Sequence, residues 1–287
     1  MSSQVVKLVA VPGDSANSQE SVDPFRESSI EHLGLLGLEA QRQQLDRDGY
    51  TVVEGALDDA FVETLRTRCT GAMDALGQDS AFMLLQADPI FAQALLHPVA
   101  VAMAEYTCGT GCIVSQVASV RKRQLTTRTS ATDLPPYADM ALHRDPYPAY
   151  SAMMTATLTL DEWTPGAGPS VVHRGSATLR RGYSKLRDTA ERRAITCPRG
   201  SIVIWDGAVH HEEAPRSLPG ERVSLHLTYT RAVYRPYEDY RDIQPQLVAE
   251  HGEVMAGLLG ANDPFGKNTP RGHDRSKMGY AVRVRNS

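Results

Sequence analysis

The sequence predicts a mainly β protein with flanking α-helices, built on a double-stranded β-helix of the jelly-roll, cupin-like type. Two observations lead to this fold class. Up to about residue 110, apolar residues recur at three- and four-residue steps, the period of helices with one buried face. From about Cys112 onward, short alternating runs are separated by Gly, Pro and Asp clusters. Short strands after a helical prelude favour a closed double sheet with the N-terminal helices packed outside it.

A glycine marks the boundary between the first clear helix and the first clear strand. Gln41–Asp48 has a helical pattern and leads into Gly49, a residue type that commonly ends a helix. Tyr50–Val53 follows as a predicted strand. Residues 1–28 are rich in Ser, Asp, Asn, Gln and Pro, and we expect a flexible tail there, in which 5–11 could form a short strand.

Two further helices are predicted before residue 110. Asp58 and Asp59 can cap the first of them. Its expected buried face consists of Val62, Leu65, Cys69, Met73 and Leu76. Asp88-Pro89 opens the second, and Pro98 breaks or restarts it because proline cannot donate a backbone hydrogen bond.

The strands of the expected barrel lie between residues 111 and 235. The clearest runs are 113–120, 152–160, 201–205 and 223–230. A helix is expected around Gln246–Leu259. We therefore expect a tail, then one domain at 29–235 with a helical prelude (29–110) and a barrel core (111–235), then a helical and irregular extension at 236–287.

Composition and charge argue against several classes of function. A net charge of -4 and an aromatic content of 6% do not favour binding to nucleic acid or to a membrane surface. No apolar run approaches the roughly 20 residues needed to cross a bilayer, and the N-terminus has no secretory signal pattern. Cys69, Cys108, Cys112 and Cys197 follow no zinc or disulfide spacing, so we expect buried free thiols in a cytoplasmic protein.

The sharpest candidate for a metal-binding motif is His143-Arg144-Asp145. On a strand, alternate residues share a face, so His143 and Asp145 could reach one ion while Arg144 points away. Two histidines and a carboxylate on one face of an octahedron hold iron(II) in non-haem oxygenases and leave positions open for a cosubstrate and dioxygen. A lone His-x-Asp arises often by chance, so the motif needs further support.

A histidine pair and an arginine give that support. His210 and His211 follow an apolar strand and a turn, so that one of them could enter a barrel while the other faces out. Arg222 and Ser224 then share one face of the last strand. An arginine binds a carboxylate through two parallel hydrogen bonds and a serine hydroxyl can add a third, which suits the distal carboxylate of 2-oxoglutarate.

These residues resemble the phytanoyl-CoA dioxygenase family of iron(II)/2-oxoglutarate oxygenases. The resemblance runs from about Arg42 to Arg231 and includes an opening strand at 48–55. His143-x-Asp145 is similar to the family's first two ligands, and Asp206-Gly-x-x-x-His211 to the segment that carries the last one. The run 168–176 is similar to its glycine-started strand, although Arg174 and Ala177 replace the usual proline and histidine.

The resemblance also implies roles for several further residues. Arg222 stands eleven residues after His211, at the place of the oxoglutarate arginine, which selects His211 over His210 as the third ligand. It implies Gln116 and Thr157 as further cosubstrate contacts. Where the family usually has a small polar residue this chain has Glu213, which would repel an incoming carboxylate unless it turns away or Ser224 takes the polar role.

The implied activity is the oxidation of an unactivated C–H bond of a small organic molecule, with iron(II), 2-oxoglutarate and dioxygen. Hydroxylation is expected, with desaturation or cyclisation as alternatives, in secondary metabolism. The residues that could contact substrate are Tyr147, Tyr150, Trp205 and Met140. His226 shares a strand face with Arg222 and could approach the cosubstrate, and residues 122–140 could form either a lid or a surface loop.

Two alternatives remain open on the sequence. The chain could be a non-catalytic jelly-roll module that binds metal, or a cupin-like metalloenzyme that does not use 2-oxoglutarate. Arg222 with Ser224 argues against both, because neither needs a carboxylate-binding pair beside its metal. A basic stretch after residue 174 could attract an anion, but a solvated face is the favoured interpretation. The expected partner is a small molecule, without nucleic acid or membrane, and the oligomeric state is left open.

Overall fold

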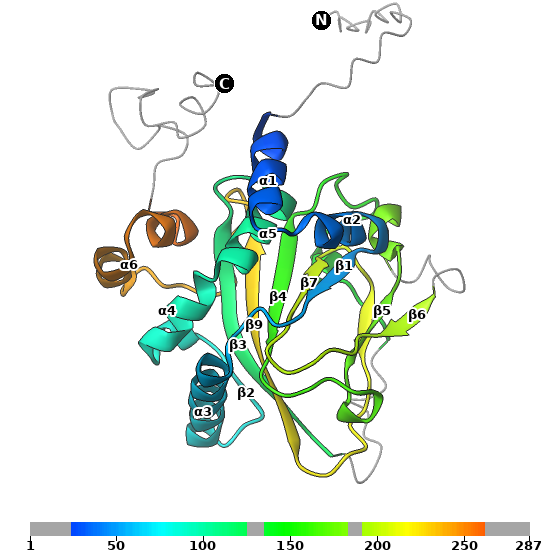
Figure 1. Cartoon of the computed structure of the whole chain (residues 1–287). Coiled ribbons are helices and arrows are strands. Elements are labelled where there is room, and N and C mark those ends of the chain that lie inside the picture. Colours follow the sequence, from blue (N-terminus) through cyan, green and yellow to red (C-terminus); the bar gives the residue numbers. More distant parts are fainter. Residues whose placement is uncertain (1–23, 125–134, 183–190, 262–287) are drawn as a thin grey trace, which may run out of the picture.

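A computed structural model describes residues 24–124, 135–182 and 191–261 (Figure 1). Two antiparallel sheets form the core, the larger in the order β1-β7-β4-β9-β3-β2 and the smaller in the order β6-β5-β8. The strands are β1 (Tyr50–Val53), β2 (Ser80–Ala81), β3 (Ile113–Arg123), β4 (Met153–Thr159), β5 (Ser170–His173), β6 (Arg192–Ala194), β7 (Ile202–Asp206), β8 (His211–Glu213) and β9 (Glu221–Thr230). The jelly roll expected from the sequence is therefore confirmed.

Six α-helices pack outside the barrel in the described part of the chain. They are α1 (Pro24–Leu35), α2 (Glu39–Asp48), α3 (Asp59–Leu76), α4 (Pro89–Leu95), α5 (Pro98–Cys108) and α6 (Gln244–Leu258). Helix α1 begins within the segment 1–28 that the sequence assigned to a flexible tail. The possible strand at 5–11 and most of the possible lid lie outside the described residues.

Local chemistry explains where α2 ends and where α3 begins and ends. Gly49 adopts a left-handed conformation (φ 81°) and its N–H donates to the Leu45 carbonyl at 2.8 Å, which ends α2. Asp58 caps α3 by accepting a hydrogen bond from the backbone N–H of Phe61 at 2.8 Å. The expected buried face of α3 is correct except for Leu76, which is 59% exposed because it lies in the last turn, beside the terminating Gly77.

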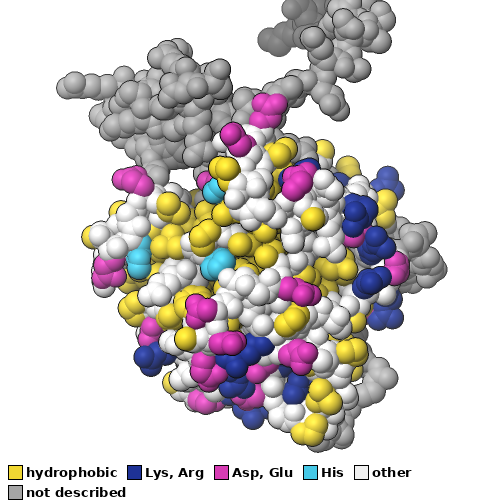
Figure 2. All heavy atoms as spheres, in the orientation of Figure 1, with side chains coloured by type: hydrophobic (Ala, Val, Ile, Leu, Met, Phe, Trp, Pro, Cys, Tyr) yellow, Lys and Arg dark blue, Asp and Glu magenta, His cyan; other side chains and the backbone are white. Residues whose placement is uncertain are grey.

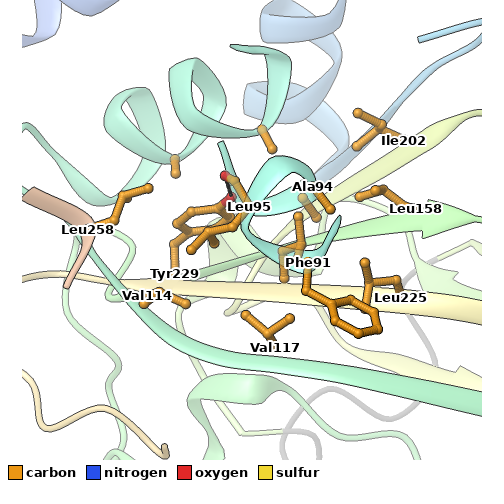
Figure 3. Close-up of a cluster of buried hydrophobic side chains, with 14 of the residues drawn as sticks. Phe91, Ala94, Leu95, Val114, Val117, Leu158, Ile202, Leu225, Tyr229 and Leu258 are labelled. Atoms are coloured by element: carbon orange, nitrogen blue, oxygen red, sulfur yellow. Dashed lines mark hydrogen bonds between the residues drawn. The ribbon is translucent and has the colours of Figure 1, made fainter. Parts of the chain in front are cut away.

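One face of the larger sheet packs against the helices (Figure 3). Helix α5 contacts β4, β7 and β9, and α3 contacts β9 and β3. Phe91 and Leu225 are fully buried there, and the Tyr229 hydroxyl donates to the Leu95 carbonyl at 2.8 Å. Because successive strand residues point to opposite faces, the apolar residues of β9 that pack on the helices leave the intervening polar residues facing into the barrel.

Basic side chains gather on one part of the molecular surface. Lys and Arg side chains gather on the edge that carries β6 (Figures 1 and 2), where Arg192 pairs with Glu212 and Arg193 with Glu191. The described part of the basic stretch is thus a solvated, ion-paired face, as expected. All four cysteines are buried and free. Among the described helices, none combines the length and apolarity that a membrane crossing requires.

Candidate functional site

The inner face of β9 carries a row of polar side chains. Arg222, Ser224 and His226 alternate with buried apolar residues, so they point away from the helices and into the barrel. The neighbouring strands place polar residues at matching positions: Thr157 of β4 lies opposite His226, and Gln116 of β3 lies opposite Thr228. The four residues expected to contact the cosubstrate therefore share one interior surface.

Arg222 is a buried cation with unused hydrogen-bonding capacity. Arg222 is only 1% exposed, and its guanidinium carbon lies 4.3 Å from the ring centroid of Trp163. Nε and Nη1 have no hydrogen-bond partner among the described residues. Buried donors are nearly always satisfied in proteins, so two unused donors on one guanidinium indicate a place for an anionic ligand.

Glu213 faces Arg222 instead of turning away from it. Its carboxylate accepts hydrogen bonds from Lys122 Nζ and Ser170 Oγ, both at 2.5 Å, and lies 3.7 Å from Arg222 Nη2. Desolvation would raise the pKa of this carboxyl, although its side chain is 42% exposed, but Lys122 and Arg222 outweigh desolvation and hold the pKa at about 2. We call Lys122, Glu213 and Arg222 the interior ion cluster. One negative and two positive charges leave it with a surplus of one positive charge.

His226 links two of the predicted cosubstrate residues, Thr157 and Ser224. Its Nδ1 lies 2.9 Å from Thr157 Oγ1 and its Nε2 lies 3.1 Å from Ser224 Oγ. Burial lowers the pKa of His226 to about 4, so the imidazole is neutral at physiological pH. Because hydroxyl groups engage both ring nitrogens, His226 positions Thr157 and Ser224 and does not offer a free lone pair to a metal.

Replacing His226 with glutamine should flatten the pH dependence of stability. The pKa of this imidazole is lower in the folded state than its ordinary value of 6.5, so the unfolded chain binds more protons and wild-type stability falls as pH drops from about 6.5 to about 4. Across that window the His226→Gln variant should lose less stability, by a margin on the order of 2 kcal/mol. Urea unfolding of both proteins at several pH values measures this margin; parallel curves would contradict a buried neutral imidazole.

His211 begins β8 and is buried at the wall of the barrel. Its Nδ1 lies 3.1 Å from the Val209 carbonyl oxygen, and its Nε2 lies 3.6 Å from Asp139 Oδ1. Tyr137 pairs with it through two backbone hydrogen bonds, of 2.8 and 3.0 Å, and the two rings are 4.5 Å apart. The sequence pattern did not single out Tyr137 or Asp139 as neighbours of His211.

The other two predicted metal ligands do not join His211 in this structure. The His143 ring packs edge-on against Tyr234, with centroids 5.2 Å apart. Asp145 is exposed, and its Oδ1 accepts a hydrogen bond from the Gly182 backbone N–H at 2.7 Å. Among the described residues, no three His, Cys, Asp or Glu side chains are grouped so that they could hold a metal ion. The predicted triad is therefore not assembled.

The proposed substrate residues divide between the barrel and its rim. Trp205 lies in the interior, with its ring 5.4 Å from that of His211 and its Nε1 donating to Asp139 Oδ2 at 3.0 Å. Met140 and Tyr147 are buried in the apolar cluster around it. Tyr150 is about half exposed, with the guanidinium carbon of Arg231 4.2 Å from its ring centroid. The structure thus places one of the four, Trp205, directly beside the polar interior.

The sequence matches the profile of a known protein family. Residues 45–217 match the sequence profile described as "Phytanoyl-CoA dioxygenase (PhyH)". That segment is more than half of the 287-residue chain. No curated protein matches the sequence.

Solved structures share the fold at low sequence identity. The epimerase SnoN from nogalamycin biosynthesis, in complex with Fe3+, alpha ketoglutarate and nogalamycin RO, has a TM-score of 0.59 and 19% identity, covering 71% of this chain and 88% of that one. EctD from S. alaskensis with bound Fe has a TM-score of 0.58 and 19% identity, with 69% and 79% covered. HygX from Streptomyces hygroscopicus with nickel and 2-oxoglutarate has a TM-score of 0.57 and 15% identity, with 70% and 89% covered. At these identities the likeness establishes the fold.

Proposed function

The chain belongs to the phytanoyl-CoA dioxygenase family, and we propose that it is an iron(II)- and 2-oxoglutarate-dependent oxygenase that uses dioxygen to oxidise a C–H bond of a small organic molecule. Hydroxylation is the simplest outcome, and desaturation or cyclisation are the alternatives. Metal and 2-oxoglutarate in the SnoN and HygX structures support the choice of cofactors. The four buried free thiols suit a reducing compartment such as the cytoplasm.

The unused donors of Arg222 carry this proposal. A dicarboxylate such as 2-oxoglutarate needs one end held by a fixed cation, and Arg222 offers Nε and Nη1 for this. Trp163 fixes the plane of the guanidinium. Glu213 offsets Lys122, so the surplus positive charge of the interior ion cluster matches one incoming carboxylate. The repulsion expected between Glu213 and the cosubstrate is thereby balanced.

The chain's own residues have binding and positioning roles in this proposal. Arg222 holds the distal carboxylate, while Ser224 and Thr157, fixed by the neutral His226, present hydroxyl groups on the same surface. Trp205 supplies an apolar wall beside His211. The oxidation itself is chemistry that a protein of this kind takes from its cofactors. Since the three predicted ligands do not meet in the structure, we assign the metal only to the neighbourhood of His211.

Binding of 2-oxoglutarate to the purified full chain tests the proposal. Calorimetric titrations without oxygen, with and without Mn(II), should show saturable binding of 2-oxoglutarate. Glutarate keeps the distal carboxylate but lacks the keto acid, so it should bind more weakly, and pyruvate, which lacks the distal carboxylate, should not bind measurably. Equal binding of pyruvate and 2-oxoglutarate, or no binding of 2-oxoglutarate, would contradict the assignment.

A further inference from the structure

Tyrosine side chains gather at the end of the barrel where β4 begins and β9 ends. Six of the chain's eleven tyrosines fall in the segments 137–150 and 231–240, and none of its five phenylalanines does. Four of these six are exposed or half-buried, and we call them the tyrosine surface: Tyr137, Tyr150, Tyr234 and Tyr237. Three of the four are between 44% and 53% exposed. Single exposed aromatic side chains are common, but several gathered together mark an interaction site.

The segment that follows β9 folds against the segment that precedes β4. Arg231 Nε donates to the Ser151 carbonyl at 2.9 Å, and its guanidinium carbon lies 4.2 Å from the centroid of the Tyr150 ring. The Tyr234 ring packs edge-on against His143, with centroids 5.2 Å apart. Tyr150 and Tyr234, which are far apart in the sequence, therefore belong to one end of the barrel.

The other two tyrosines border the barrel interior. The Tyr137 ring lies 4.5 Å from that of His211, and the Tyr237 hydroxyl donates to Met153 Sδ, at the start of β4, at 3.7 Å. Desolvation, helped by the charge of Asp139, raises the pKa of both tyrosines, so their hydroxyl groups stay protonated and can donate hydrogen bonds. The tyrosine surface thus extends from solvent to the imidazole of His211.

A buried carboxylate fixes the backbone that carries Tyr237. Glu238 is 6% exposed, and its backbone N–H donates to the Ser115 carbonyl at 2.9 Å. Its carboxylate accepts the backbone N–H groups of Val117 at 2.7 Å and Met83 at 2.8 Å. The Tyr237 N–H donates to Ser115 Oγ at 3.1 Å. Because these bonds hold the segment against β3, the exposed ring is presented from a fixed backbone, and a ligand that binds it orders little of the chain.

The tyrosine surface and the proposed cosubstrate arginine lie at opposite ends of β9. Arg222 is the second residue of that strand, whereas the segment 231–240 begins directly after its last residue, Thr230. At ~3.3 Å per residue the two ends are about 26 Å apart. A cosubstrate held by Arg222 therefore leaves the end with the tyrosines for the substrate.

We propose that the tyrosine surface recognises the substrate, and that the substrate is a planar ring compound with oxygen substituents. The proposal rests on the proposed function, because it names the substrate class of that reaction. Tyrosine rings stack on flat ring systems, and their hydroxyl groups donate to carbonyl and hydroxyl oxygens. An aliphatic substrate would need no such donors, and purely apolar aromatic side chains are absent from both segments except for Trp205 beneath them.

Binding of 2-naphthol and of decahydro-2-naphthol to the full chain tests the proposal. The two compounds share a bicyclic skeleton with one hydroxyl group, but only 2-naphthol is planar. Ligand-observed NMR titrations without iron and 2-oxoglutarate compare wild type with the double variant Tyr150→Leu/Tyr237→Leu. Tyr106→Leu is the matched control, because Tyr106 is a half-buried tyrosine of α5 whose hydroxyl donates to Asp46. Circular dichroism and thermal unfolding establish that each variant is folded.

We expect wild type to bind 2-naphthol at least about tenfold more tightly than the saturated compound. The double variant should lose roughly tenfold in affinity for 2-naphthol, since each aromatic contact contributes about 2- to 10-fold. Tyr106→Leu should stay within about twofold of wild type. Equal binding of the two compounds by wild type, or wild-type affinity in the folded double variant, would overturn the proposal. Because 2-naphthol does not use Arg222, this result is independent of the 2-oxoglutarate titration, and a failure of either assignment is recognised separately.

Discussion

Replacing Arg222 with leucine is expected to abolish measurable binding of 2-oxoglutarate. In the wild type the guanidinium is buried and two of its nitrogens have no hydrogen-bond partner among the described residues. In the variant an incoming carboxylate would be buried beside Glu213 with only Lys122 to offset both negative charges. Breaking a buried charge pair in this way costs about 3–5 kcal/mol, or roughly 100- to 5,000-fold in affinity. Calorimetry of both proteins without oxygen measures the loss.

Two further variants make this experiment specific. Arg222→Lys keeps the charge but loses the planar fork, so it should retain part of the affinity. Arg216→Lys is the matched control, because Arg216 is also a buried arginine but its guanidinium donates to the backbone carbonyls of Ala167, Pro219 and Gly220. Its affinity for 2-oxoglutarate should stay close to that of wild type. A folded Arg222→Leu protein with wild-type affinity would remove the basis for the proposed cosubstrate site.

Replacing His211 with alanine is expected to abolish binding of iron(II). His211 is the histidine whose Nε2 faces Asp139, with its other nitrogen toward the Val209 carbonyl. His226 cannot take its place, because hydroxyl groups hold both of its ring nitrogens. We expect a loss of more than about 100-fold, larger than the roughly 10- to 100-fold cost of removing a group that only orients a ligand. The bound metal is measured after equilibration with iron(II) without oxygen.

His210→Ala is the matched control, because it makes the same deletion at the adjacent position. Burial lowers the pKa of His210 to about 4, with a smaller contribution from His173, whose backbone N–H donates to the His210 carbonyl at 2.8 Å. The variant should bind iron(II) with nearly wild-type affinity. Retention of iron by His211→Ala together with its loss from His210→Ala would reverse the ligand assignment.

The sequence predicts those parts of the structure that depend on local chemistry. Gly49 ends α2 and Asp58 caps α3 because each acts within a few residues of itself. The alternation of Arg222, Ser224 and His226 on one strand face likewise predicts their common surface. Arg222, which its spacing from His211 singles out as the candidate cosubstrate cation, is buried and has two unused donors.

Features that depend on distant parts of the chain could not be predicted in this way. The backbone pairing of Tyr137 with His211, and with it the approach of Asp139 to that imidazole, joins segments that lie far apart in the sequence. Glu213 was expected to repel the cosubstrate because its partner Lys122 lies 91 residues earlier in the chain.

The decarboxylation of 2-oxoglutarate tests the central claim most directly. Wild-type protein supplied with iron(II), dioxygen and 2-oxoglutarate labelled at C1 is incubated with a broad panel of small metabolites, and the released carbon dioxide and succinate are counted. Release that is stimulated by a member of the panel, that requires iron(II) and that is absent from Arg222→Leu is the predicted result. Release no greater than that of the Arg222→Leu protein with every compound would contradict the assignment as a 2-oxoglutarate-dependent oxygenase.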